Sequence, residues 1–446
     1  MNGFAERRAR LVRELAASAG VAAPVRLGKR TSNLFRDRAE TPRRSLDVRD
    51  FGHVLEVNAA ERWVDVEGMS PYEALADATL ARGLMPCVVP QLKSITIGGA
   101  VAGVGIEASS FRYGLVHETV LELEVLAGDG SIVLARPDNE HRELFYGFPN
   151  SYGTLGYALR VRARTAPVKP FVRLEHVHHS EPEAFFGNLA ALCASPADFV
   201  EGVVFGPAEL ATTAGRFVEA APYTSDYTYQ RIYYRSLRER DEDYLTARDF
   251  LWRWDTDWFW CSKNLYAQNP IVRRLLGRKR LNSTFYTRVM RWNSRVGLTK
   301  RLDRLTGRHP ESVIQDVDIP IDRAPEFLAF FLREIGIRPV WICPFRAYDP
   351  GASWTLFPTR PNALYVNFGF WDVVRRHEAH APGHFNRLIE RKVAELGGIK
   401  SLYSDSYFPR EEFAGIYNQG AYDALKRRYD PDRRFKDLYE KCVLRH

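Results

Sequence analysis

Short segments that alternate apolar and polar residues dominate the first third of the chain. Residues 54–58 (VLEVN) and 63–67 (WVDVE) show this pattern, as do residues 120–126 (VLELEVL) and 131–135 (SIVLA). A period of two places successive side chains on opposite faces of a strand, so each segment predicts a β-strand. The sequence AGDG between the last two segments predicts a hairpin turn.

The middle of the chain mixes two periods. Residues 199–205, 340–343 and 364–368 are apolar runs of strand length. Residues 324–335 and 384–396 instead repeat their apolar positions with the spacing of a helix. Because strands and helices occur together, these patterns predict an α+β fold.

Changes in composition divide the chain into four parts. Residues 1–24 predict a short amphipathic helix, and residues 25–170 predict a strand-rich domain that ends at two prolines. Residues 171–400 hold eight of the nine tryptophans and predict a second domain. Residues 401–446 are rich in tyrosine and phenylalanine and predict a separate closing segment.

Composition narrows the class of protein. The chain has 446 residues, of which 45% are hydrophobic and 26% are charged, which excludes a disordered or low-complexity protein. No run approaches eighteen apolar residues, which predicts that no helix spans a membrane. The five cysteines form no CxxC pair, which indicates reduced thiols and a cytoplasmic location.

The net charge of +8 is concentrated in one segment. Residues 269–308 contain twelve Lys or Arg residues and one acid, Asp303, a net +11 that leaves −3 for the rest of the chain. Apolar and aromatic residues are interleaved with these cations, which is typical of helices that lie on an anionic membrane surface. A solvated face and a nucleic-acid-binding surface remain alternative interpretations of the same pattern.

Two glycine-rich elements occur in the strand-rich part of the chain. Residues 95–105 (ITIGGAVAGVG) form the denser element, and residues 151–156 (SYGTLG) form the second. Residues 103–108 match the GxGxx(G/A) dinucleotide fingerprint, but residues 109–114 have the composition of a loop where that fingerprint requires a helix. Closely spaced glycines let a backbone approach phosphate groups, so the two elements predict a two-sided cradle, with a purely structural turn as the alternative.

Several motifs together resemble a known flavoprotein family. Residues 90–114, the hairpin around residues 128–130 and residues 151–156 resemble the FAD-binding domain of the vanillyl-alcohol oxidase/PCMH superfamily. Further motifs resemble its 24-dehydrocholesterol reductase (Δ24-sterol reductase) branch: EASS at 107–110, LFY at 144–146, VIQD at 313–316, PVWICPF at 339–345, LYSD at 402–405 and REEF at 410–413. The likeness covers nearly the whole chain from about residue 25.

This resemblance implies a domain arrangement. It implies a two-subdomain PCMH-type FAD-binding domain over residues 25–170 and an α+β substrate or cap domain over residues 171–400. It also implies that residues 401–446 pack back near the flavin.

The resemblance implies FAD as the cofactor, bound without a covalent link. Members of the superfamily often attach flavin through a His or Cys, but residues 29–33 contain neither, Leu92 stands at the second attachment position, and Cys87 lies too early. The residues implied to hold FAD are Arg30, Thr31, Ser32, Asn33, Gln91, Lys93, Ser94, Thr96, Ile97, Gly98, Gly99, Ala100, Gly103, Gly105, Ile106, Glu107, Ser109, Ser110, Gly153, Thr154 and Gly156.

The branch implies reduction of a lipid carbon–carbon double bond, with NADPH as the source of electrons. One implied substrate is a 10-methylene fatty acyl chain of a phospholipid, which the bacterial relatives most similar to this sequence reduce to the 10-methyl chain in fatty acid biosynthesis. The other is a sterol Δ24 bond. Oxidation of a carbinol by FAD on the same fold is the first alternative, and a non-catalytic scaffold that binds membrane or nucleic acid is the second.

Such a reduction requires a positioned acid in a dry pocket, because protonation of the less substituted carbon builds cation character on the other carbon. The candidates are Tyr403, Asp405 and Tyr407, followed by Glu107 and His117. For a buried tyrosine, a hydrogen bond within the core is the alternative interpretation.

A lipid substrate favours the membrane interpretation of residues 269–308. The sequence therefore predicts a cytoplasmic protein that lies peripherally on the inner face of the membrane, with a methyltransferase as a candidate partner and without a nucleic-acid partner. The aromatic run at 251–260 (LWRWDTDWFW) either lines an acyl tunnel, lies at a bilayer interface, or forms a domain core. The histidines at 176–179 and 377–384 lack spaced Cys or carboxylate partners, so no metal is predicted.

Overall fold

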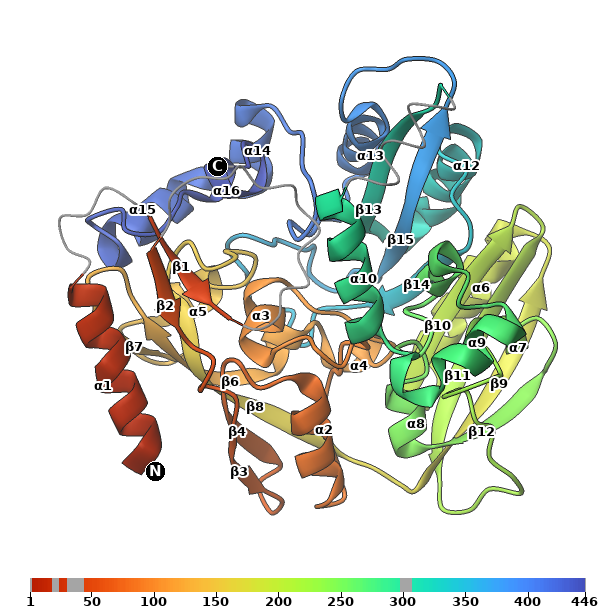
Figure 1. The fold of residues 1–446 in the computed structure, drawn as a ribbon, viewed down its shortest axis with the longest axis horizontal. Coiled ribbons are helices and arrows are strands. Elements are labelled where there is room, and N and C mark those ends of the chain that lie inside the picture. Colours follow the sequence, from red (N-terminus) through yellow and green to blue (C-terminus); the bar gives the residue numbers. More distant parts are fainter. Residues whose placement is uncertain (1, 18–23, 30–43, 297–306, 446) are drawn as a thin grey trace.

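The computed structural model describes residues 2–17, 24–29, 44–296 and 307–445. Within these residues the chain forms a six-stranded sheet, an eight-stranded sheet and a parallel pair of strands, β1 (Val25–Gly28) and β2 (Arg44–Asp47). We call the parts built on the two large sheets the first domain and the second domain. Figure 1 shows them side by side, with the C-terminal helices beside the first domain. The mixture of helices and sheets confirms the predicted α+β fold.

The sheet of the first domain is antiparallel, with the order β3-β4-β8-β6-β7 and with β5 paired to β8. Its strands are β3 (Val54–Asn58), β4 (Trp63–Glu67), β5 (Leu84–Pro86), β6 (Val120–Leu126), β7 (Ile132–Ala135) and β8 (Tyr157–Pro167). The accompanying helices are α2 (Tyr72–Leu80), α3 (Ile97–Ala102), α4 (Ser110–Tyr113), the 3₁₀ helix η1 (Val116–Thr119) and α5 (Arg142–Gly147). The predicted strands are confirmed, whereas the loop expected at 109–114 contains the single turn α4.

The two faces of this sheet differ because side chains alternate along β8. Val161 and Ala163 belong to the hydrophobic core, whereas Arg160 lies on the opposite face. There Arg160 forms ion pairs with Asp65 at 2.8 Å and Glu122 at 2.6 Å on the neighbouring strands. Cross-strand charge pairs therefore stabilise one face of this sheet, and the apolar side chains of the other face pack against helices.

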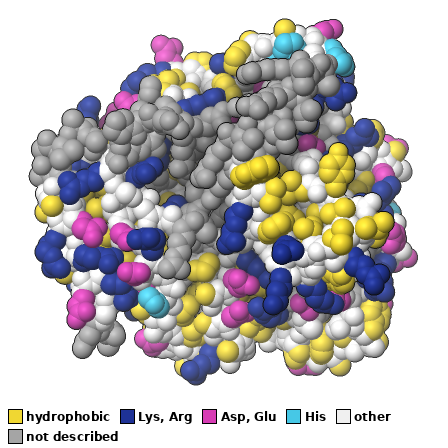
Figure 2. Space-filling view, in the orientation of Figure 1, with side chains coloured by type: hydrophobic (Ala, Val, Ile, Leu, Met, Phe, Trp, Pro, Cys, Tyr) yellow, Lys and Arg dark blue, Asp and Glu magenta, His cyan; other side chains and the backbone are white. Residues whose placement is uncertain are grey.

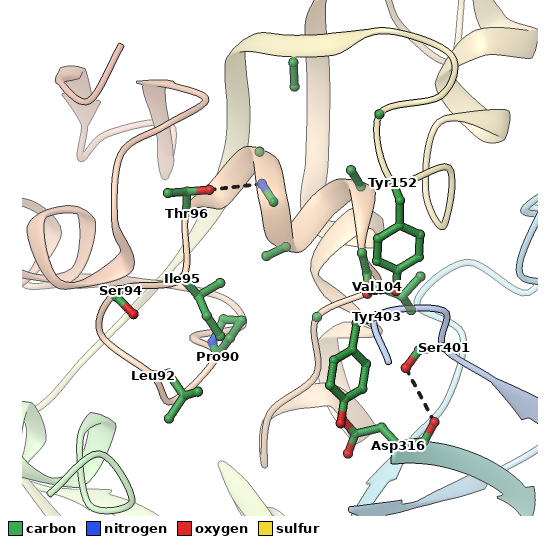
Figure 3. Close-up of a pocket in the computed structure, with 18 of the residues that line it drawn as sticks. Pro90, Leu92, Ser94, Ile95, Thr96, Val104, Tyr152, Asp316, Ser401 and Tyr403 are labelled. Carbon is green, nitrogen blue, oxygen red and sulfur yellow. Dashed lines mark hydrogen bonds between the residues drawn. The ribbon is translucent and has the colours of Figure 1, made fainter. Parts of the chain in front are cut away.

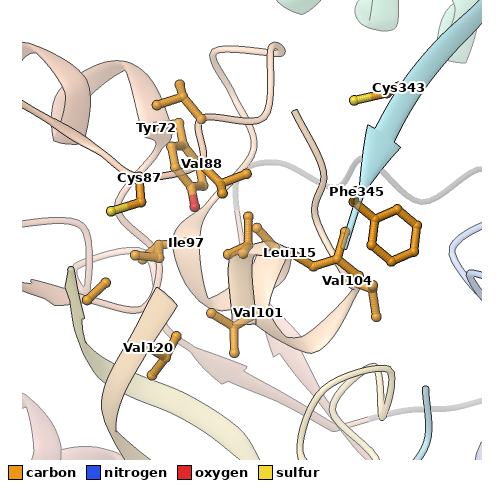
Figure 4. Close-up of a cluster of buried hydrophobic side chains, with 14 of the residues drawn as sticks. Tyr72, Cys87, Val88, Ile97, Val101, Val104, Leu115, Val120, Cys343 and Phe345 are labelled. Carbon is orange, nitrogen blue, oxygen red and sulfur yellow. The ribbon is translucent and has the colours of Figure 1, made fainter. Parts of the chain in front are cut away.

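The core of the first domain extends into the second domain. Figure 4 shows Ile97 and Val101 of α3 packed near Val120, with Cys343 and Phe345 of the second domain at the edge of the same cluster. All five side chains are buried. Because the cluster crosses between the sheets, the two domains share one hydrophobic core.

The sheet of the second domain has the order β12-β9-β11-β10-β14-β15-β13-β16. Its strands are β9 (Phe171–His179), β10 (Phe199–Gly206), β11 (Glu209–Val218), β12 (Glu242–Thr246), β13 (His309–Pro320), β14 (Val340–Phe345), β15 (Tyr365–Arg376) and β16 (Ile399–Lys400). The helices α6 (Pro182–Cys193), α12 (Ala324–Glu334) and α13 (His384–Glu395) pack on one face, and the 3₁₀ helix η4 (Ile321–Arg323) precedes α12.

Period-two alternation decides which side chains of this sheet face the first domain. On β15, Phe368 and Phe370 pack in the core beneath α12 and α13, so Asn367, Gly369 and Trp371 take the opposite face. That second face points toward the first domain, and it carries the side chains that matter for the site described below.

The remaining helices lie in two groups. Between β11 and β13 the chain forms α7 (Tyr233–Ser236), α8 (Ala247–Leu251), η2 (Cys261–Leu265), α9 (Pro270–Leu276), η3 (Arg278–Arg280) and α10 (Ser283–Val296). The chain ends contribute α1 (Asn2–Ala16), α14 (Arg410–Ile416), α15 (Gln419–Tyr429) and α16 (Leu438–Cys442). Lys426 of α15 donates to the Thr154 carbonyl at 2.6 Å, which ties the closing segment to the first domain. No helix within the described residues has the length and apolar character needed to cross a membrane.

Candidate active site

A cavity of about 560 Å³ lies between the first domain and the second face of the eight-stranded sheet. Its walls come from β1, the segment 90–106, the start of β8, and strands β13, β14 and β15. Figure 3 shows α3 and the loop that precedes it on one side of this cavity, and Tyr403 and Asp316 on another. The volume is within the roughly 300–1,000 Å³ typical of sites for small molecules.

Many of the residues predicted to hold FAD line this cavity. They are Gln91, Ser94, Thr96, Gly98, Gly99, Ala100, Gly103, Gly105, Ile106, Gly153 and Gly156. The two glycine elements lie 50 residues apart in sequence, and the fold brings both to the same cavity. Arg30, Thr31, Ser32 and Asn33 lie outside the described residues.

The glycines at the start of α3 allow close packing of the backbone. The Gly98 amide donates to the Gly68 carbonyl at 2.9 Å, and a Cβ at Gly98 would lie 2.7 Å from that oxygen. Thr96 caps the helix by accepting from the Gly99 amide at 3.3 Å. Both amides therefore donate to partners within the chain and are not free N–H donors. The lack of side chains at these glycines instead lets a bound molecule approach the backbone closely.

Three of the predicted FAD ligands have structural roles instead. The Ser109 hydroxyl donates to the Cys87 carbonyl at 2.7 Å, and the Thr154 hydroxyl donates to the Ser151 carbonyl at 2.8 Å. Ile97 packs within the core. None of the three lines the cavity, so this structure does not place them with the other predicted FAD-binding residues.

Lys93 and Ser110 also lie outside the cavity lining. The Lys93 ammonium lies 3.3 Å from Glu73, and the Ser110 hydroxyl accepts from the Glu107 amide at 3.1 Å. The sequence placed these residues beside the glycine cluster, but their side chains point into other contacts.

Cationic side chains line the end of the cavity formed by β1 and the closing segment. Arg26, Lys29, Lys436 and Lys441 contribute to the wall there, and the acids that line the cavity, Asp316 and Asp318, come from the second domain. Cations at one end suit a diphosphate, while the glycine-bordered middle admits a flat, narrow group. The residues of this cavity therefore fit FAD: the cations would hold its diphosphate, and the glycine-bordered middle would admit its ring system.

Glu107 is a buried structural charge and lies behind the cavity wall. Arg253 forms ion pairs with Glu107 and with Glu201, each at 2.9 Å, and all three side chains are buried. Trp341 also donates to Glu201, at 2.9 Å, and Gln91, which lines the cavity, donates to Glu107. Burial raises the pKa of Glu107, but its partners occupy both carboxylate oxygens, so its prediction as a catalytic acid is corrected.

His117, Asp405 and Tyr407 do not line the cavity either. Burial lowers the pKa of His117 to about 3, so its ring is neutral, and it packs edge-on against Trp354 with centroids 4.4 Å apart. Asp405 lies 3.5 Å from the Arg445 guanidinium, which also covers the ring of Tyr407. This structure therefore does not bring these three predicted acids to the cavity.

Tyr403 does line the cavity, and its hydroxyl is held between two partners. The Trp371 indole N–H donates to the Tyr403 oxygen at 2.9 Å, and the Tyr403 hydroxyl hydrogen-bonds to the Asp316 carboxyl. Figure 3 shows Tyr403 directed at Asp316. Burial raises the pKa of Tyr403 well above its ordinary value, so the phenol stays protonated and orients the carboxyl beside it.

Asp316 is a cavity residue that sequence reasoning did not select as an acid. Burial raises the pKa of Asp316 to about 7, although its hydrogen bond from Tyr403 acts in the opposite direction. The Asp316 oxygen Oδ1 is buried without a hydrogen-bond partner among the described residues. A carboxyl in this state keeps its proton near neutral pH, and one of its oxygens remains available to a bound molecule.

Asp318 is a second carboxyl on the same face of β13. It lies two residues beyond Asp316 and accepts from the Asn367 amide at 2.8 Å. Burial raises the pKa of Asp318 to about 8, and the neighbouring charge of Asp316 adds to this effect. Two carboxyls so close cannot both ionise easily, so the pair retains a proton at neutral pH.

A glycine on the neighbouring strand makes room for this arrangement. Gly369 is the cross-strand partner of Asp316. A Cβ at Gly369 would lie 2.8 Å from Asp316 Oδ1 and 2.7 Å from the Trp371 ring. The absence of a side chain at Gly369 thus lets the carboxyl and the indole reach the cavity together.

The aromatic run at 251–260 lies inside the protein. Trp252, Trp254 and Trp260 are buried in the shared core, and Trp258 and Phe259 also line the cavity. The core interpretation is thus correct for the run, and two of its side chains also form cavity wall. Its exposure at a bilayer interface is excluded by this burial.

Comparisons with known proteins agree with these features. Residues 8–136 match the family model described as an FAD binding domain. The chain is 29% identical to the Delta(24)-sterol reductase of Homo sapiens over 412 residues, which cover 87% of this chain and 75% of that protein. It is 24% identical to the Delta(24)-sterol reductase of Arabidopsis thaliana over 439 residues, which cover 89% of this chain and 76% of that protein.

A further relative with a different name matches a smaller part of the chain. Cytokinin dehydrogenase 6 of Oryza sativa subsp. japonica is 29% identical over 178 residues, which cover 39% of this chain and 33% of that protein. Together the comparisons confirm the resemblance to the FAD-binding, Δ24-sterol reductase-like branch.

Proposed function

We propose that this chain, a flavoprotein of the Δ24-sterol reductase-like branch, reduces a carbon–carbon double bond of a lipid. The observation that carries the proposal is one cavity lined both by the two glycine elements and by Asp316 and Asp318. Burial raises the pKa of these two carboxyls to about 7 and about 8. The chain matches proteins named as Delta(24)-sterol reductases over most of their length, and these matches support the same reaction class.

The carboxyl pair supplies what an unpolarised double bond lacks. In the proposed reaction the Asp316 carboxyl gives its proton to the less substituted alkene carbon, which leaves tertiary cation character on the other carbon. When bound and reduced, FAD supplies a hydride equivalent to that carbon, so the product is the saturated chain. Asp316 then recovers a proton from Asp318 or from solvent, and NADPH restores the electrons.

The walls of the cavity favour both halves of this reaction. Trp258, Phe259, Trp341 and Trp371 border the carboxyls with apolar rings. Such walls exclude water and keep Asp316 protonated, and their faces stabilise a developing cation. Tyr403 acts in this proposal as the positioning residue that orients Asp316, which revises its expected role as the acid itself.

We propose a 10-methylene acyl chain of a phospholipid as the substrate and NADPH as the electron donor. A sterol-type Δ24 bond presents the same trisubstituted or 1,1-disubstituted alkene chemistry and is the second substrate to test. With such a substrate the protein would be cytoplasmic and peripheral on the inner face of the membrane, within fatty acid biosynthesis, and a methyltransferase that makes the methylene lipid is its candidate partner.

An anaerobic reaction of the purified protein tests the proposal. We expect a yellow protein whose flavin is bleached by NADPH and regains its absorbance when a methylene phospholipid or a Δ24 sterol is added. Mass spectrometry of the recovered lipid should show a gain of two hydrogens. A colourless protein, or reduced flavin that neither lipid reoxidises, would refute the proposed reaction.

The second candidate function is oxidation of a carbinol on the same fold. The partial match to a protein named as a cytokinin dehydrogenase favours it, and that match covers 39% of this chain. The same preparation decides between the two, because an oxidase would form peroxide from an alcohol in air without any need for NADPH.

A further inference from the structure

Four large apolar side chains are exposed on the segment that links β12 to β13. Tyr266, Ile271, Leu275 and Trp292 keep 79%, 72%, 77% and 59% of their surface accessible. Ile271 and Leu275 are four residues apart on α9, so they share one face of that helix. Figure 2 shows apolar side chains gathered over α9 and α10. Contiguous exposed apolar surface of this kind usually marks an interaction site.

The packing of α10 dictates the exposure of Trp292. The Tyr286 hydroxyl donates to the Thr256 carbonyl at 2.9 Å, and Met290 packs against the core, so these two side chains mark the inner side of α10. Trp292 follows Met290 by two residues, about 200° around the helix, and therefore faces away from the core.

Cations surround the apolar side chains. Arg274, Lys279, Arg280 and Arg288 are exposed on α9, η3 and α10. Residues 269–296 contain no Asp or Glu. An apolar surface with a rim of cations matches the boundary between acyl chains and anionic headgroups.

Arg273 does not belong to this rim. It is buried and ion-paired with Asp257, so its charge is not available to a membrane surface. Arg278 is exposed but paired with Asp226 at 2.8 Å. Among the described residues of 269–290, Arg274, Lys279, Arg280 and Arg288 are therefore the exposed cations outside these two ion pairs.

The composition of the face favours a bilayer over other occupants. A second copy of this chain on a twofold axis would place the same cations opposite one another, with no acid in residues 269–296 to compensate them. A nucleic acid would neutralise the cations but would leave the apolar side chains in water. An anionic bilayer satisfies both components at once.

We propose that the α9–α10 face, formed by Tyr266, Ile271, Leu275 and Trp292 and its cationic rim, docks on an anionic lipid bilayer. The docking itself stands without the proposed reaction. Its consequence, that a membrane lipid is delivered to the cavity, rests on the proposed function.

The docking face is connected to the cavity through one buried carboxylate. Asp255 accepts from the Ser283 hydroxyl at 2.6 Å, at the start of α10, and from the Lys93 amide at 3.1 Å. The neighbours of Lys93 on either side, Leu92 and Ser94, line the cavity. A bilayer on this face would therefore lie next to the loop that borders the candidate active site.

Co-sedimentation with vesicles tests the docking directly. The full-length protein is mixed with vesicles of phosphatidylcholine and phosphatidylglycerol, or with vesicles of phosphatidylcholine alone. We expect binding to the anionic vesicles that weakens with salt. The triple variant Arg274→Gln, Lys279→Gln, Arg280→Gln should bind them on the order of 100-fold more weakly at low salt.

Matched variants separate this face from general surface properties. The double variant Ile271→Ser, Leu275→Ser should lose at least about tenfold in vesicle affinity, whereas Val177→Ser, which is also exposed, should bind normally. The triple variant Arg82→Gln, Arg216→Gln, Arg427→Gln removes three exposed cations elsewhere and should also bind normally.

The outcomes are distinguishable from failure of the proposed reaction. Flavin content and the rate of flavin reduction by NADPH are measured on the same preparations and should be unchanged in every variant. Equal binding to neutral vesicles, or equal loss in the control variants, would overturn the docking proposal. So would a dimer in solution that the Ile271→Ser, Leu275→Ser variant dissociates, because the face would then be covered by a second copy.

Discussion

Replacing Asp316 by asparagine removes the proton that the proposed reaction requires. The variant keeps the size of the side chain and an acceptor for the Tyr403 hydroxyl. A positioned general acid contributes a factor of roughly 10²–10⁴ to a rate. We therefore expect reoxidation of the reduced flavin by substrate to slow by that factor, or about 3–5 kcal/mol, while reduction by NADPH keeps its rate.

The dependence of rate and stability on pH gives a second test of the role of Asp316. Burial raises the pKa of Asp316 from 3.8 to about 7, so the wild-type rate should fall as pH rises through about 7. The folded state binds this proton more tightly than the unfolded chain does. Stability is therefore lost as pH rises from 3.8 to about 7, by at most about 4 kcal/mol. The asparagine variant should lack the contribution of Asp316 to both effects, and Asp318, whose pKa burial raises to about 8, should still contribute to the loss of stability.

Stopped-flow absorbance of the flavin under anaerobic conditions measures the two half-reactions separately, and denaturant unfolding at several pH values measures the stability. Asp322→Asn is the matched control, because that carboxyl is exposed and lies just beyond the same strand. Reoxidation of the Asp316→Asn variant at the wild-type rate would refute the assignment of the acid. An unchanged fall in rate above pH 7 would do so as well.

Other changes probe the support of this carboxyl and of the core. Tyr403→Phe removes a hydrogen bond that lowers the pKa of Asp316, so the fall in rate should move to higher pH in the same stopped-flow assay; a fall at the wild-type pH would contradict this. Gly369→Ala introduces a Cβ 2.8 Å from Asp316 Oδ1 and should cost about 1–3 kcal/mol in unfolding free energy and slow reoxidation, with flavin content retained. Arg253→Met leaves two buried glutamates without their partner and should cost about 3–5 kcal/mol by thermal unfolding, whereas Arg248→Met, at an exposed pair, should cost about 1 kcal/mol or less.

Local patterns in the sequence were sufficient for much of the fold. Period-two alternation located the strand at 120–126, because Leu123 and Val125 pack in the core and Glu122 and Glu124 pair with Arg160 on the other face. The glycine elements at 95–105 and 151–156 likewise pointed to one cavity, since close approach of two backbones demands glycine whatever the ligand.

The same reasoning misplaced residues whose role depends on side-chain direction. Glu107 and Ser109 follow the glycine cluster in sequence, yet their side chains turn to Arg253 and to the Cys87 carbonyl. Arg273 was counted among surface cations although it is buried with Asp257. These partners could not be identified from proximity in the sequence, because each partner lies on a different segment of the chain.

The signal for the carboxyl pair was present but incomplete. In residues 313–320 (VIQDVDIP), Val317 belongs to the core beneath α12 and α13, so alternation assigns Asp316 and Asp318 to one shared face. Nothing in the segment says what that face meets. Period-two alternation cannot distinguish an acid that faces water from an acid that faces a dry cavity, because both occupy a polar position of the strand.

By itself, the sequence determined the strands, the glycine elements, the family resemblance and the position of the basic segment, since each depends on residues close together in the chain. Only the tertiary structure decided which side chains line the cavity and which lie elsewhere. It placed Asp316 beside Tyr403 and Trp371, where burial keeps its proton, and it left Tyr266, Ile271, Leu275 and Trp292 exposed beside cations. Protonation and exposure are properties of surroundings, and the surroundings of these residues are assembled from strands and helices far apart in sequence.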